Sequence, residues 1–402
     1  MVEKNLNKFF ESFLQKEPLF INKKSLQSNY TPNNVPHRKE QIDLVAGILA
    51  PALRSDKPSN IFIYGKTGTG KSLTVTHVCE NLNQIAEKNK IPVKFIFLNC
   101  KLKRVADTEY RLIAQLIREL GQDVPATGLP TEEIYKIFVN IVEKMDQLLI
   151  IVLDEIDQLV KKIGDELLYN LTRLNAELKE SQISIIGISN DLLFTDQLDP
   201  RVKSSLSEEE IVFPPYNALQ LQSILRQRAK LAFKNETLAE GVIEKCAAYA
   251  AREHGDARRA LELLRVAGEI AERKNLTVIA ISHIDEAEDK IERDRILDIT
   301  TTQPKQFKLA LYSMLTVCEK NNHKIFTGEV YESYRDNCAR CAVQPLTQRR
   351  LSDIIAEFDM LGIINAKTIS KGRYGRTREI SLAIPLSLVP KVKTLLQESL
   401  NL

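Results

Sequence analysis

Short apolar runs alternate with segments of helical periodicity over the first half of the chain. The runs lie at 60–64, 93–99, 148–153, 183–189 and 210–213. Each is almost continuously apolar, which is typical of strands that helices cover on both faces of a parallel sheet. The pattern therefore predicts an α/β domain with a parallel sheet and crossover helices.

The pattern changes after residue 216. From Asn217 to about Arg293 apolar residues recur at helical spacing, which predicts a small helical bundle. A polar segment at 300–304 predicts a hinge. Beyond it we expect helices near 304–321, 328–341 and 347–361, two short strands around Gly372 to Gly375, and a last helix near 386–400. The predicted parts are a leader at 1–36 and domains at 37–216, 217–296 and 297–402.

Length and composition narrow the class of protein. At roughly 150 residues per domain, 402 residues allow two or three domains. The apolar content of 44% and charged content of 27% exclude collagen-like and wholly disordered chains. Six scattered cysteines fit a reducing compartment, so we expect a cytoplasmic protein. The longest aliphatic run is much shorter than the roughly 18 residues that cross a bilayer, so we expect no membrane partner.

Residues 65–72 match the phosphate-binding pattern G-x-x-x-x-G-K-[ST]. They follow a predicted strand and precede a predicted helix, as the pattern requires. Backbone N–H groups and the helix N-terminus would attract the phosphates of ATP or ADP. We expect Lys71 to reach the β and γ phosphates and Ser72 to bind Mg²⁺. The predicted ligands in this loop are Gly65, Thr67, Gly68, Thr69, Gly70, Lys71, Ser72 and Leu73.

Polar groups follow two further buried strands. Asp154 and Glu155 end the run at 148–153, and parallel sheets bind ligands at the carboxyl ends of their strands. We expect Asp154 to hold Mg²⁺ and Glu155 to accept a proton from the water that attacks the γ-phosphate. Asn190, after the next strand, can hold that water. Taken alone, such residues also serve as solvated caps and turn formers.

With these motifs the chain resembles the AAA+ ATPases. Within them it is similar to the archaeal replication initiators that are related to both the largest subunit of the origin recognition complex and the helicase-loading factor. The resemblance covers nearly the whole chain and also rests on residues 35–41, 198–205, 214–218 and 255–260. It implies a P-loop parallel sheet with a helical lid at 217–296, followed by a winged-helix DNA-binding domain at 297–402.

The resemblance also assigns roles to residues outside the phosphate loop. Arg201 matches an arginine finger offered to a neighbouring nucleotide, and Arg258 matches the lid arginine that contacts the γ-phosphate. Such guanidinium groups make domain closure depend on whether ATP or ADP is bound. Read alone, Arg201 can be a surface ion-pair partner and Arg258 a helix-face cation. The other implied nucleotide-binding residues are Val35, Pro36, Arg38, Tyr216 and Arg228.

A second resemblance lies between the second and third predicted strands. Residues 101–121 are similar to a helical insertion with which such initiators touch DNA. Its positive charges are Lys101, Lys103, Arg104, Arg111 and Arg118. A charged crossover helix has the same composition, so both interpretations stay open.

The last domain holds the local excess of positive charge. Residues 297–402 contain 15 Lys and Arg against 10 Asp and Glu, which favours a nucleic-acid partner. Residues 347–355 look like a recognition helix capped by Thr347, and 370–378 look like a basic wing. Arg349 suits guanine or phosphate. A basic hairpin that serves only solubility, or that binds protein, would have a similar sequence. The predicted DNA-binding residues are Gln348, Arg349, Arg350, Lys371, Arg373, Tyr374, Arg376 and Arg378.

Together these features predict an ATP-dependent replication initiator. It would bind origin double-stranded DNA and recruit the replicative MCM helicase, with or without paralogous initiator subunits, and use slow ATP hydrolysis as a molecular switch. Two alternatives remain open from the sequence. One is a regulatory DNA-binding protein that uses nucleotide as a structural ligand, and the other is a signalling ATPase whose winged helix binds protein only.

Overall fold

The computed structural model of the chain forms two compact units, Met1–Ile284 and Asp285–Leu402. The structure describes residues 17–28, 30–32, 34–101, 108–125, 128–206, 208–320, 325–370 and 376–402. In these ranges no helix has both the length and the apolar character needed to span a membrane.

The first unit contains a five-stranded parallel sheet with the strand order β2-β3-β4-β1-β5. The strands are β1 (Ile61–Tyr64), β2 (Val93–Asn99), β3 (Leu148–Asp154), β4 (Gln182–Ser189) and β5 (Glu209–Val212). Each end lies within one residue of its predicted position. The prediction of a parallel α/β sheet is confirmed.

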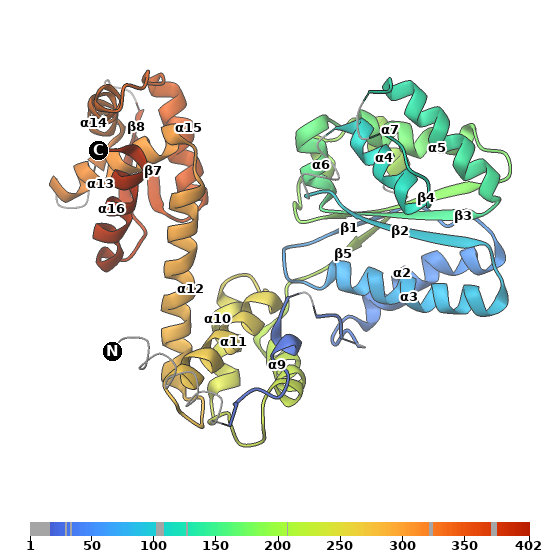
Figure 1. Ribbon diagram of the computed structural model, residues 1–402, viewed down its shortest axis with the longest axis horizontal. Helices are drawn as coiled ribbons and strands as arrows, with labels where there is room; N and C mark the ends of the chain where they lie inside the picture. The colour runs from blue at the N-terminus through green and yellow to red at the C-terminus, as the bar shows by residue number, and fades with distance from the viewer. Residues whose placement is uncertain are drawn as a thin grey trace, which may run out of the picture. The chain divides into compact units, whose positions relative to one another are not determined.

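Helices cover both faces of this sheet, which explains why its strands are almost continuously apolar (Figure 1). One face is covered by α2 (Lys39–Leu49) and α3 (Lys71–Asn89), and the other by α4 (Glu109–Glu119), α5 (Thr131–Met145), α6 (Ile156–Ile163) and α7 (Glu166–Arg173). The short helix α8 (Pro200–Leu206) precedes β5. Because β1, β3 and β4 are neighbours, the segments that follow them meet at one edge of the sheet.

The lid follows the sheet as a set of helices, α9 (Ala218–Ala232), α10 (Val242–Arg252), α11 (Ala257–Arg273) and the start of α12 (Ile281–Thr302). Asn217 and Gln220 form a capping box that begins α9. The chain before residue 37 also packs on the lid from residue 17 onward. Phe20 lies 4.8 Å from Phe233, ring centre to ring centre, and the short turn η1 (Lys23–Leu26) buries Leu26.

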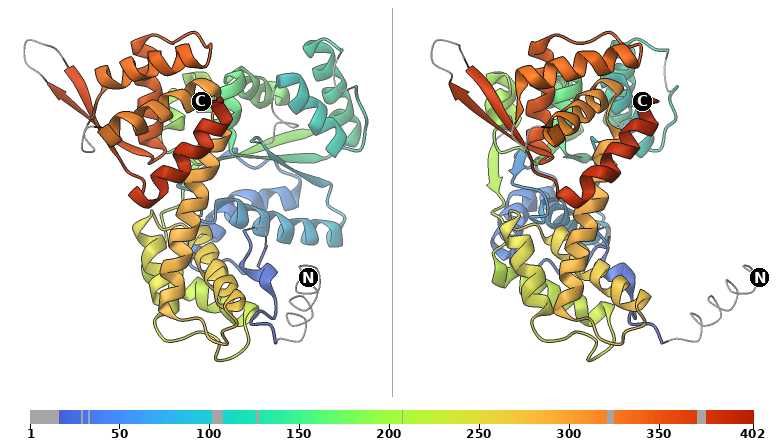
Figure 2. Two further views of the ribbon diagram at one scale, coloured as in Figure 1. Left: turned by 60° about the vertical axis from the view of Figure 1, so that its left-hand side comes forward. Right: turned by 90° about the vertical axis from the view of Figure 1, so that its left-hand side faces the viewer.

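The second unit is a winged helix. Three helices, α13 (Lys305–Lys320), α14 (Thr327–Arg340) and α15 (Gln348–Met360), pack with the antiparallel strands β6 (Ile325–Phe326), β7 (Ile364–Ser370) and β8 (Arg376–Leu382), in the order β6-β8-β7. A turn η6 (Leu386–Leu388) leads into the last helix, α16 (Val389–Leu400). Figure 2 shows β7 and β8 as a two-stranded ribbon that extends away from these helices.

The predicted hinge at 300–304 is wrong for its three threonines, which form the last turn of α12. The hydroxyls of Thr300, Thr301 and Thr302 donate to carbonyl oxygens four residues earlier, at 2.7, 3.0 and 2.8 Å. The polar run is thus helical up to Thr302, and its hydroxyls find their acceptors within the helix.

Candidate functional site

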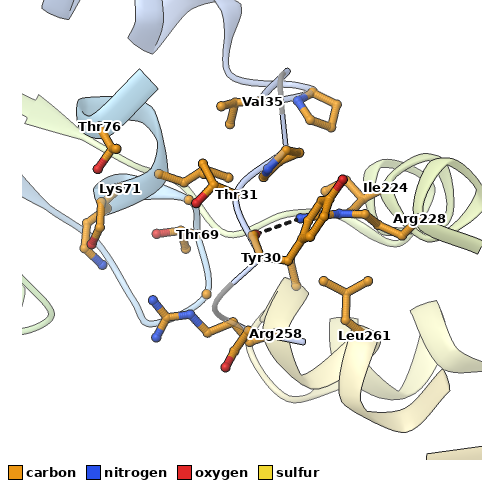
Figure 3. A pocket seen from close by; sticks show the side chains of 18 of the residues that line it. Tyr30, Thr31, Val35, Thr69, Lys71, Thr76, Ile224, Arg228, Arg258 and Leu261 are labelled. Atoms are coloured by element: carbon orange, nitrogen blue, oxygen red, sulfur yellow. Dashed lines mark hydrogen bonds between the residues drawn. The ribbon is translucent and has the colours of Figure 1, made fainter. Parts of the chain in front are cut away.

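A cavity of about 530 Å³ lies where the carboxyl edge of the sheet, the lid and residues 27–36 meet (Figure 3). Most of the predicted nucleotide residues line it, although they come from seven separate stretches of the chain. They are Val35, Pro36, Gly68, Thr69, Gly70, Lys71, Ser72, Leu73, Asp154, Glu155, Asn190, Tyr216, Arg228 and Arg258.

Lys71 is a buried cation that contacts uncharged acceptors. Its side chain is 5% exposed, and its ammonium donates to Gly65 O (2.6 Å), Lys66 O (2.8 Å) and Asn190 Oδ1 (2.8 Å). Burial lowers its pKa to about 8, although Asp154 acts in the opposite direction. Carbonyl and amide oxygens hold the ammonium in place without neutralising it. The charge is therefore available to an anion in the cavity.

Two glycines allow the loop to approach its neighbours closely. Gly68 has φ +68°, and a Cβ there would lie 1.7 Å from Asp256 Oδ1 of the lid. Gly70 has φ +88° and faces the Tyr216 hydroxyl, 2.8 Å from an added Cβ. Asp256 also begins α11 by accepting from Arg258 N at 2.7 Å. The lid thus packs directly on the phosphate-binding loop.

Ser72 and Asp154 form the pair that fits a divalent cation. The Ser72 hydroxyl donates to Asp154 Oδ2 at 2.8 Å, and Asp154 Oδ1 accepts from Glu155 N at 3.0 Å. Hydroxyl and carboxylate oxygens are the ligands that Mg²⁺ prefers. The pair lies beside Lys71, where a nucleotide's phosphates would complete the coordination.

Glu155 has an unusual backbone. It begins α6 with φ +56° and ψ +44°, a left-handed conformation that is costly for a residue with a Cβ. Its carboxylate lies 3.7 Å from Lys101 Nζ. Glu155, the predicted proton acceptor, lines the cavity.

The far end of the cavity is built to take a flat group. Arg228 lies over the ring of Tyr30 at 4.4 Å and donates to Tyr30 O at 3.4 Å (Figure 3). Arg228 is 8% exposed, and its buried Nη1 has no hydrogen-bond partner among the described residues. Burial also lowers the pKa of Arg228, so the protein does not fully compensate the desolvation of its charge. An unsatisfied donor beside an aromatic ring fits the base and ribose end of a nucleotide.

Tyr30 is a site residue that sequence reasoning missed. It lies in the segment predicted as a leader, and the nearest signal in the sequence is the Pro/Asn-rich stretch at 31–36.

Arg38, Gly65 and Thr67 are not among the described residues that line the cavity. Arg38 is 2% exposed and lies beneath the loop, where Nε donates to Thr69 O at 2.8 Å and Nη2 donates to Pro214 O. Its guanidinium lies 3.9 Å from the ring centre of Tyr216. In this structure Arg38 supports the loop from behind.

The two predicted γ-phosphate arginines lie in different places. Arg258 reaches from α11 towards the loop that carries Thr69 and Lys71 (Figure 3). Arg201 is not among the residues that line the cavity. It lies on α8 with its side chain 71% exposed, where Nε and Nη2 contact Asp199 at 3.1 and 3.0 Å. Arg201 therefore lies on the surface, apart from the described residues that line the cavity.

The segment between β2 and β3 contains α4 and α5. Of its predicted DNA contacts, Lys103 and Arg104 lie outside the described residues. Arg118 Nη2 donates to Val124 O at 3.3 Å at the end of α4.

The start of α15 is exposed. Thr347 caps it by accepting from Arg350 N at 3.3 Å, and Gln348, Arg349 and Arg350 are all exposed. Arg378, on β8, is half-buried and donates to Ser352 O at 2.8 Å, which ties the wing strand to the helix. Of the other predicted wing residues, Lys371, Arg373 and Tyr374 lie outside the described residues, and so does the side chain of Arg376.

Three family models match the chain. They are an AAA domain over residues 54–193, the Cdc6 AAA+ ATPase-type lid domain over 222–289, and the CDC6 C-terminal winged helix domain over 298–392. With the fold and the cavity, they define the class: an AAA+ ATPase with a Cdc6-type lid and winged helix.

Known proteins of archaea resemble the chain over most of its length. An ORC1-type DNA replication protein of Pyrococcus abyssi is 53% identical over 384 residues, which cover 94% of this chain and 91% of that protein. One from Archaeoglobus fulgidus is 52% identical over 373 residues, or 93% and 90% of the two chains. The chain belongs to the family of ORC1-type DNA replication proteins.

Solved structures agree with this assignment. The structure of the Aeropyrum pernix ORC1 protein in complex with DNA is 43% identical, with a TM-score of 0.86, and the match covers 95% of this chain and 98% of that one. Cdc6p from Pyrobaculum aerophilum is 21% identical over 95% and 100% of the two chains, with a TM-score of 0.60, and shares the fold.

Proposed function

We propose that this protein is an ATP-switched initiator of DNA replication that binds origin double-stranded DNA through its winged helix and recruits the replicative MCM helicase. The observation that carries the proposal is the cavity, in which the phosphate-binding loop and the lid arginines Arg228 and Arg258 face one ligand space. A ligand held from both sides links the lid position to the state of the nucleotide.

Each side chain has a part in this switch. When bound, ATP with its Mg²⁺ supplies the phosphoryl group and the positive charge that neutralises it. Ser72 and Asp154 hold the cation, and Lys71 contacts the β and γ phosphates. Glu155 orients the attacking water and accepts its proton, and Asn190 holds that water against the phosphate. Hydrolysis is slow if, as proposed, it only resets the switch.

Arg258 is the group that distinguishes ATP from ADP. Its contact with the γ-phosphate is lost on hydrolysis, and this loss releases the lid. Arg201, exposed on α8, would make the equivalent contact with the nucleotide of a paralogous subunit or a second copy. Such a contact would make hydrolysis depend on assembly.

The DNA-binding half of the proposal rests on α15. Gln348 and Arg349 are exposed at the N-terminal turn that winged helices place in the major groove, and Arg350 is suited to phosphate. The Aeropyrum pernix ORC1 protein was solved in complex with DNA, which supports the proposal that this protein binds DNA.

The test is binding of the full chain to fluorescent origin DNA, by anisotropy, with ATP and with ADP over a salt series. We expect a steep loss of affinity with salt, a preference for origin sequence, and a difference between the nucleotides. With ATP, the Glu155→Gln variant should keep the DNA affinity of the ATP-bound state over time, because we expect this variant to bind ATP without hydrolysing it.

Two results would contradict the proposal. If the wild type and Glu155→Gln both lack ATPase activity and bind DNA alike with either nucleotide, the nucleotide is a structural ligand. If binding is weak, sequence-blind and unchanged by Arg349→Ala, the winged helix binds protein instead.

A further inference from the structure

Asp157 is a buried carboxylate close to the phosphate end of the cavity. It lies in the first turn of α6, three residues after Asp154, and is 2% exposed. Burying a charge is costly unless hydrogen bonds satisfy it, so its partners indicate its purpose. Oδ1 accepts from Ser189 Oγ at 3.3 Å and from Asn190 N at 3.4 Å, and Oδ2 accepts from Gln158 Nε2 at 2.7 Å.

These contacts surround Asn190. The single hydroxyl hydrogen of Ser189 is shared between Asp157 Oδ1 at 3.3 Å and Asp191 O at 3.2 Å, and Ser189 Oγ accepts from Asp191 N at 3.0 Å. The carboxylate therefore fixes the residue before Asn190 directly, the backbone of Asn190 directly, and the residue after it through one hydroxyl. The position of the Asn190 side chain follows from the backbone that these bonds hold.

Asn190 in turn contacts the loop lysine, since Asn190 Oδ1 accepts from Lys71 Nζ at 2.8 Å. We propose that Asp157 is a positioning residue for the nucleotide site: its carboxylate holds the turn after β4 so that the Asn190 amide faces Lys71 and the γ-phosphate. The inference rests on the proposed function of this cavity as an ATP site. Asp157 itself does not touch the nucleotide.

The fold gives Asp157 an environment that suits a charged anchor. The N-terminal turn of a helix stabilises a carboxylate through its free N–H groups and dipole. The anchor therefore keeps Asn190 in place beside Lys71.

The same turn has a second, exposed link to α6, which provides a matched control. Lys161 Nζ lies 3.5 Å from Asp191 Oδ2, with the two side chains 53% and 29% exposed. Exposed ion pairs contribute little, and this one does not contact Asn190. Lys161→Ala removes a link between the same two segments without removing the buried anchor.

The experiment compares Asp157→Ala, Asp157→Asn, Ser189→Ala and Lys161→Ala in the full chain. Single-turnover hydrolysis, the affinity for fluorescent ATP and ADP analogues, and amide hydrogen exchange of residues 186–194 are measured. We expect Asp157→Ala to slow hydrolysis by about 30- to 100-fold, because a misplacement of about 1 Å can cost 100-fold. ADP affinity should stay within about threefold, the preference for ATP should vanish, and exchange should quicken.

The other variants should show smaller losses of hydrolysis rate and of ATP preference. Asp157→Asn keeps an acceptor oxygen and should lose less than Asp157→Ala, Ser189→Ala should fall between the wild type and Asp157→Ala, and Lys161→Ala should stay within about twofold. Adding Asp157→Ala to Asn190→Ala should change ATP affinity and hydrolysis no further, since both act through one amide.

Several outcomes would overturn the inference. Effects of Asp157→Ala and Asn190→Ala that multiply would show that the two act separately. An equal loss of ATP and ADP affinity, with a lower melting temperature, would show a structural role. If Asp157→Ala does not fold, the Ser189→Ala and Asp157→Asn variants test whether Asp157 positions Asn190. A wild type without hydrolysis refutes the proposed ATPase, and exchange and the affinity cycle still decide the role of Asp157.

Discussion

The nucleotide cavity and the start of α15 use the same kinds of residue in opposite settings. In the cavity, Lys71 and Arg228 are 5% and 8% exposed, and protein atoms hold both. On α15, Gln348 and Arg349 extend into solvent. A buried cation is placed by the fold before any ligand arrives, whereas an exposed one is placed by its partner. Single residues should therefore matter more in the cavity than on the helix.

The sharpest test of this difference compares two lysines of one loop. Lys71→Ala should weaken ATP and ADP binding by about 100-fold, because a hydrogen bond to a charged group contributes roughly 1.5–3 kcal/mol. Lys66 is exposed, and only its backbone oxygen contacts Lys71. The nucleotide affinity of Lys66→Ala should therefore stay within about twofold of the wild type. Titration with a fluorescent nucleotide measures both, and equal losses would refute the distinction between buried and exposed cations.

On the winged helix, the expected loss of affinity depends on the DNA sequence. Arg349→Ala should lower origin affinity by about 5- to 150-fold, the equivalent of about 1–3 kcal/mol, and relax the preference for one sequence. Lys391→Ala removes the same charge from an exposed position on α16 and serves as the control. Anisotropy with specific and scrambled DNA measures both. Equal, sequence-blind losses would reduce Arg349 to a general phosphate contact.

The same contrast explains what the sequence could predict. The strands, Lys71, Ser72, Asp154 and Asn190 belong to a local pattern whose spacing fixes their geometry, so their meeting at one sheet edge follows from strand order. The prediction of AAA+ architecture with a winged helix is confirmed by the matching family models.

Other residues depend on contacts between distant segments, which no local pattern encodes. Tyr30 joins the cavity because residues 17–36 pack on the lid, and Asp256 reaches Gly68 across 188 positions of sequence. Asp157 is visible as a third acid after β3, but its burial is not. Arg38 lies behind the loop because the aromatic ring of Tyr216 holds it there. The threonines at 300–302 lie in α12, where their hydroxyls donate to carbonyl oxygens one turn earlier.

The pH dependence of nucleotide affinity tests the buried cation Lys71. Burial lowers the pKa of Lys71 from 10.5 to about 8, and the carboxylates of Asp154, Asp157 and Asp256 offset only part of this effect. Phosphates bind the ammonium form. Affinity should therefore be level below pH 8 and fall by up to about tenfold per pH unit above it, until the higher pKa of the complex is reached.

The stability of the empty protein should change in the opposite direction. Between pH 8 and 10.5 the unfolded chain keeps a proton that the folded protein has lost, so the contribution of Lys71 to the free energy of unfolding rises with pH. Nucleotide titrations and thermal melts from pH 7 to 10 measure the two effects. Lys71→Arg does not titrate in this range and should give a flat affinity profile, however weak its binding. A flat profile in the wild type as well would mean that Lys71 keeps its charge, and that the oxygens around it compensate its burial.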